Sequence, residues 1–127
     1  MKLAPLVLAA LVAQSNGTFM QVATPCQARI ELAQHDQLLT VTGYCRSTAL
    51  APARYRYQLR MLHRSHASHS QSNQGGEFTL LPGQDLRLSE VRVSVLEHYK
   101  YRAQLVVFDL QGHEVARDSA GQVYAAH

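Results

Sequence analysis

The chain of 127 residues has no tryptophan, only two cysteines and few charges: 12 Lys and Arg stand against 9 Asp and Glu. A formal net charge of +3 is small for a general nucleic-acid binder, which usually carries dense clusters of Lys and Arg. Two cysteines without a Cys-x-x-Cys pair exclude a four-cysteine zinc site. The missing tryptophan excludes the buried indole of antibody domains.

Sequence patterns of several enzyme classes are also missing. There is no Gly-x-Ser-x-Gly nucleophile elbow, and the acidic residues are too scattered for a carboxylate pair to be proposed from their spacing. Gly75-Gly76 lacks the lysine and the following helix of a phosphate-binding loop. The sequence therefore predicts a protein that is not an enzyme and needs no cofactor.

Long apolar runs are absent except at the beginning, where Lys2 precedes an uncharged segment rich in Leu, Ala and Val. A membrane span needs about 20 apolar residues, whereas polar residues interrupt this run from Gln14 onward. We expect a signal peptide over residues 1–17, with cleavage after Ala13 or after Gly17. The rest, residues 18–127, is expected to be one exported domain without membrane insertion.

Alternation of polar and apolar residues dominates the exported part. In Ala53–His63, tyrosines and aliphatic residues alternate with arginines, and Tyr99–Asp109 repeats the pattern. Between such segments lie Ser47–Pro52, which suits a crossing between sheets, and the turn Leu81–Gln84. The pattern predicts an all-β, immunoglobulin-like β-sandwich of about seven antiparallel strands in two sheets.

Two irregular segments are expected within this sandwich. Polar Ser65–Gly76 suits a narrow strand at the edge of a sheet. The apolar positions change parity between Leu88 and Val91, which predicts a bulge near Ser89–Glu90.

The two cysteines suggest a disulfide in an exported chain. If the chain reverses at His35-Asp36, Cys26 faces Cys45, and the apolar residues of both strands share one face. A four-residue loop, Gln34–Gln37, would place the cysteines at a site where opposite strands approach closely. We therefore predict a Cys26–Cys45 disulfide, worth roughly 3 kcal/mol in the chain-entropy model.

Cations concentrate on two of the alternating strands. Arg54, Arg56 and Arg60 project from one, Lys100 and Arg102 from the other, with no acid between them. The third and sixth strands of an immunoglobulin-like sandwich are neighbours, which would merge all five cations into one patch. We predict that this patch binds an acidic protein partner; the alternative is an ordinary solvated sheet face.

A series of histidines is the one arrangement that suggests a metal site. His63, His66 and His69 are spaced so that, along one strand, His63 and His69 share a face and His66 points away. No nearby acid orients the rings. Copper or zinc binding is therefore an alternative function, and an exposed polar loop is the simpler interpretation.

Four segments resemble the small periplasmic curli-assembly inhibitors of the CsgH-like family, which is related in fold to CsgC. They are the strand Tyr55–Leu59, the Ser-Gln-Ser-Asn-Gln-Gly-Gly-Glu-Phe tract at 70–78, the Leu-Pro-Gly-Gln turn at 81–84, and Tyr101–Leu105. The Cys-x-Cys pair of the CsgC branch is missing, which removes a redox role.

The resemblance implies a periplasmic, monomeric, chaperone-like protein that suppresses amyloid formation by the curli major subunit through electrostatically guided, transient binding. Its candidate contacts in this sequence are the five cations: Arg54, Arg56, Arg60, Lys100 and Arg102. Besides metal binding, an adhesin or pilus accessory module remains as an alternative.

Overall fold

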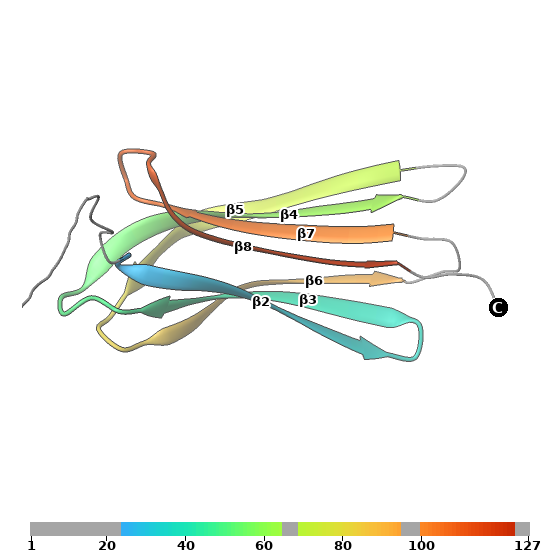
Figure 1. The fold of residues 1–127 in the computed structure, drawn as a ribbon, viewed down its shortest axis with the longest axis horizontal. Coiled ribbons are helices and arrows are strands. Elements are labelled where there is room, and N and C mark those ends of the chain that lie inside the picture. The colour runs from blue at the N-terminus through green and yellow to red at the C-terminus, as the bar shows by residue number, and fades with distance from the viewer. Residues whose placement is uncertain (1–23, 65–68, 95–99, 124–127) are drawn as a thin grey trace, which may run out of the picture.

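The computed structural model describes residues 24–64, 69–94 and 100–123. Its strands are β2 (Cys26–His35), β3 (Leu38–Ser47), β4 (Ala53–Arg64), β5 (His69–Leu80), β6 (Asp85–Ser94), β7 (Lys100–Phe108) and β8 (Glu114–Val123). They form two packed sheets, of order β2-β3-β6 and β5-β4-β7-β8, in which neighbouring strands run antiparallel (Figure 1). The predicted all-β sandwich of seven antiparallel strands is confirmed.

The signal peptide over residues 1–17, with both cleavage sites, lies outside the described residues. No helix in the described part of the chain is long and apolar enough to cross a membrane.

The alternating pattern of β4 places its apolar side chains between the sheets. Tyr55, Leu59 and Met61 are buried there, while the arginines between them are exposed. Leu105 of β7 and Val41 of β3 complete the core from the two sheets. Burying one such aliphatic side chain contributes roughly 1.5–3 kcal/mol, so the alternation itself sets which face of β4 meets solvent.

The predicted connections are confirmed. Ser47–Pro52 carries the chain from one sheet to the other, since β3 and β4 belong to different sheets. At the turn after β5, Gly83 has φ +75° and the Gln84 N–H donates to the Leu81 carbonyl at 3.0 Å. The bulge lies at Leu88, because Gly43 pairs with Ser89 whereas Tyr44 pairs with Arg87.

The predicted register of the first hairpin is wrong. Cys26 lies opposite Ser47, and Ala28 lies opposite Cys45, so the pairing is displaced by two residues. A two-residue turn, Asp36-Gln37, replaces the expected four-residue loop, because Asp36 adopts a left-handed φ of 56°, which Asp tolerates better than most residues. A displacement of two preserves side-chain parity, so the predicted apolar residues still share one face. Cys26, Leu39, Val41 and Cys45 of this face are buried, whereas Leu32 is 37% exposed.

Cys26 and Cys45 are therefore diagonal neighbours, both buried and present as free thiols. The hydrogen bond to Cys26 and the burial of the side chain raise the pKa of the Cys45 thiol. The disulfide between them stays a prediction, and its formation needs the two strands to adjust at this end of the hairpin.

Candidate partner-binding surface

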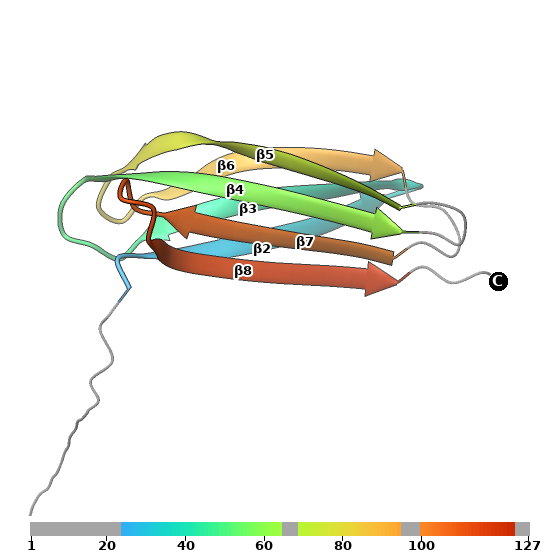
Figure 2. The ribbon, with the colours of Figure 1, turned by 90° about the horizontal axis from the view of Figure 1, so that it is seen from above.

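The outer face of the four-stranded sheet carries the predicted cations. Residues that lie opposite each other in antiparallel strands share a face, and Arg56 pairs with Phe108, Arg60 with Gln104 and Leu62 with Arg102. Arg54 and Lys100 follow the same parity. Figure 2 shows β4 and β7 side by side in the centre of this sheet. All five cations predicted from the sequence therefore lie on one surface.

Strand β5 changes the charge of one end of this surface. Glu77 lies opposite Arg56, and its carboxylate accepts from Arg54 Nη2 at 3.0 Å and from Arg56 Nε at 3.4 Å. The expectation that these two arginines lack an acidic neighbour is wrong. Sequence reasoning counted acids only on the two cationic strands, whereas the neighbouring edge strand supplies this one.

The opposite end of the surface keeps its positive charge. Arg60, Lys100 and Arg102 are joined there by Arg64, which lies directly opposite Lys100. We call these four residues the cationic cluster. Among the described residues, none of the four forms an ion pair with a carboxylate. Like charges directly opposite each other on a sheet are unfavourable, so this arrangement favours an anionic partner.

Arg64 is the member that the sequence analysis missed. It has the same parity as Arg54, Arg56 and Arg60, and the expected strand simply ended one residue too early, at His63. Extending the alternation by one residue would have found it.

The cationic cluster borders an open hollow of about 350 Å³ where β4, β5, β7 and β8 approach one end of the sheet. Its lining includes Arg64, Lys100 and Arg102 together with Tyr101, whose side chain is buried on the inner face of β7. Leu62, which is 37% exposed, lies opposite Arg102 and adds an apolar centre among the cations. The surface thus offers positive charge around a partly apolar hollow.

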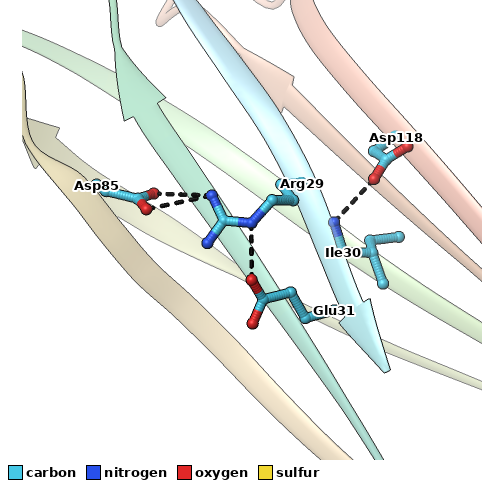
Figure 3. A network of polar contacts seen from close by, with 5 residues as sticks. All are labelled: Arg29, Ile30, Glu31, Asp85 and Asp118. Atoms are coloured by element: carbon cyan, nitrogen blue, oxygen red, sulfur yellow. Dashed lines mark hydrogen bonds and ion pairs between the residues drawn. The ribbon is translucent and has the colours of Figure 1, made fainter. Parts of the chain in front are cut away.

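Most charges on the outer face of the other sheet have partners of opposite sign. Arg29 donates to Glu31 at 3.0 Å and to Asp85 at 3.2 Å (Figure 3). Its guanidinium lies 4.3 Å from the centre of the Tyr44 ring. On β6, Arg87 and Arg92 both pair with Glu90. Among the described residues, Arg46 is the one cation of this face without an ion pair, whereas the cationic cluster gathers four such cations on the other sheet.

The histidine series does not assemble as expected. Because the chain reverses between β4 and β5, His63 pairs with Ser70 and His69 pairs with Arg64, which places the two histidines on opposite faces. The expectation that they share a face is wrong. The His63 ring instead stacks on Tyr101, with centroids 5.6 Å apart, and bonds to the Ser70 hydroxyl. His66 lies outside the described residues.

Comparison with known proteins gives no match among family models or curated proteins, but it gives clear structural likeness. The curli protein CsgC of E. coli aligns with a TM-score of 0.61 and 17% identity, covering 74% of this chain and 96% of CsgC. CsgH of R. palustris aligns at 0.55 and 20% identity, covering 77% and 91%. The chain has a CsgC- and CsgH-like fold.

The same sandwich also occurs in unrelated proteins. A part of the β-glucuronidase 2 of Bacteroides uniformis, 14% of its chain, aligns with a TM-score of 0.57 and 10% identity over 79% of this chain. A fold shared with a segment of a glycosidase does not by itself determine function, whereas the side chains on the surface are specific to this chain.

Proposed function

We propose that this protein takes part in curli assembly as a periplasmic, chaperone-like inhibitor that binds the amyloid-forming subunit transiently. The cationic cluster carries the proposal: four cations without carboxylate partners among the described residues lie on a fold that covers nearly all of CsgC and CsgH. The partner expected from this surface is an acidic, aggregation-prone protein.

Electrostatic attraction suits such an inhibitor. A positive surface speeds the encounter with an acidic chain, and salt screens the attraction over about 10 Å at 0.1 M ionic strength. Exposed cations bind weakly once contact is made, which permits release of the subunit for secretion. The protein would therefore act by frequent, short contacts at a low ratio to its client.

A fibrillation assay tests the proposal directly. Purified curli major subunit is followed by thioflavin fluorescence with substoichiometric amounts of this protein, at low and at high salt. We expect a longer lag at low salt and a much smaller extension at high salt, because screening weakens the encounter. An unchanged lag at both salt concentrations would contradict the proposed function.

A further inference from the structure

The two sheets end in four edge strands: β2 and β6 in one, β5 and β8 in the other. An edge strand carries backbone N–H and C=O groups without a neighbouring strand, and these can pair with another extended chain. The edges of this sandwich differ in how they are covered.

The β2 edge is covered by the other sheet. Asp118 of β8 accepts a hydrogen bond from the Ile30 backbone N–H at 2.8 Å, across the gap between the sheets. Figure 3 shows this carboxylate beside β2, next to the ion pairs of Arg29. A strand approaching β2 from this side would have to displace Asp118.

The β5 edge is open. Every residue from His69 to Glu77 is exposed. Within the described residues, no side chain hydrogen-bonds to the β5 backbone over this stretch. The contact with β6 is a hydrogen bond between the side chains of Ser89 and Gln74, which leaves the backbone of β5 free. The outward groups of β5 therefore face solvent.

The residues of β5 do not protect this edge either. Natural edge strands are usually blocked by lysine, proline or a bulge. Ser70–Gly76 contains no charged residue and no proline. Its pairing with β4 has no register shift, so it contains no bulge. Gly75 and Gly76 leave the backbone uncovered by side chains.

We propose that the β5 edge over Ser70–Gly76 takes up an extended segment of the client, rich in Gln, Asn, Ser and Gly, as a fifth strand of the sheet. This inference rests on the proposed function and names its docking mode. Backbone pairing supplies affinity in such strand addition, and Gln and Asn side chains stack well on like neighbours.

The charge beside this edge sets the chemistry of the client segment. Arg60 lies opposite Asn73, and Arg64 lies opposite His69, so both arginines border the open strand. A segment with an acidic residue near its polar run would meet these cations as it pairs with β5. The cationic cluster then attracts the client, and the β5 edge holds it.

Amide hydrogen exchange tests the docking site in the full protein. Exchange is measured by NMR with and without purified curli major subunit during the lag phase. We expect slower exchange at alternate amides of Ser70–Gly76, because only every second N–H of a strand points outward. Amides of β2 are the internal control and should not change. Protection of β2 without protection of β5 would overturn the proposal.

Proline substitution provides a second, independent measurement. Of Ser72→Pro and Asn73→Pro, one removes an N–H that bonds to β4 and the other removes an outward N–H. Circular dichroism identifies the variant that keeps the fold. About ten times more of that variant than of the wild-type protein should be needed to produce the same lag, because losing roughly one hydrogen bond weakens binding about tenfold.

The matched controls are Ser72→Ala and Asn73→Ala, which keep the backbone N–H and should lose less inhibition than the folded proline variant. If the folded proline variant also inhibits like the wild type, the edge does not dock the client, although the proposed function stands. If the wild type itself leaves the lag unchanged, the proposed function fails, and the docking mode fails with it.

Discussion

Single residues decide how much positive charge this surface offers. Glu77 and its partners Arg54 and Arg56 are about half exposed, with side-chain exposures of 46%, 58% and 54%. Exposed ion pairs of this kind contribute about 0–1 kcal/mol to stability. Glu77 therefore matters less for folding than for shifting the positive potential toward the cationic cluster.

Charge reversal in the cationic cluster is expected to weaken inhibition. In the double variant Arg60→Glu and Arg102→Glu, the encounter with an acidic client should slow about tenfold at low salt, because attraction becomes repulsion. The lag measured by thioflavin fluorescence should shorten toward that of the subunit alone.

The matched control is the double variant Arg87→Glu and Arg92→Glu. It changes the net charge equally, on the other sheet, at side chains that are both 65% exposed. Equal loss of inhibition in both variants would mean that net charge, rather than the cationic cluster, guides the contact. Circular dichroism confirms that each variant is folded.

Among the elements, the edge strands β2 and β5 differ in what covers them. The Asp118 side chain reaches from β8 to the backbone of β2 and closes that edge, whereas β5 keeps its outward groups free of side-chain hydrogen bonds within the described residues. An extended chain therefore meets fewer obstacles at β5 than at β2. This arrangement suits a protein that contacts amyloid-forming chains without joining them.

Removal of the Asp118 carboxylate is expected to open the second edge. In Asp118→Ala the partly buried Ile30 N–H loses its acceptor, which should cost about 1–3 kcal/mol in the free energy of unfolding. Urea denaturation measures this loss, and light scattering should detect self-association through β2. Asp118→Asn keeps an acceptor oxygen and should stay close to wild type; equal destabilisation by both would contradict the role of this hydrogen bond.

At the scale of the whole molecule, the sandwich places its two cysteines in one buried cluster with Tyr55, Leu80 and Val107. The thiols lie diagonally across the β2–β3 hairpin and are shielded from solvent. In an oxidising compartment, closure of this pair would restrain the unfolded chain more than the folded one.

We expect protein isolated from an oxidising compartment to contain the Cys26–Cys45 disulfide. Reduction should lower the free energy of unfolding by roughly 3 kcal/mol, and urea denaturation with and without reductant measures the difference. A Cys26→Ala and Cys45→Ala variant should be insensitive to reductant. Detection of two free thiols in the denatured, unreduced protein would show that this prediction is wrong.

The sequence alone determined the features that depend on side-chain parity. A strand has a period of two residues, so the alternation in Ala53–His63 and Tyr99–Asp109 already assigned the arginines to solvent and the tyrosines to the core. The same parity survived the error in the first hairpin, because a displacement of two residues leaves every side chain on its face.

Which residues of different strands meet became clear from the fold alone. The proximity of Glu77 to Arg54 and Arg56, the separation of His63 from His69, and the hydrogen bond between Asp118 and Ile30 all depend on pairings between strands. Register follows from turn geometry and from packing between sheets, which act over long separations in the chain. Local alternation carries no information about pairings between strands that are far apart in the sequence. These pairings determine which cations of the surface have a carboxylate partner.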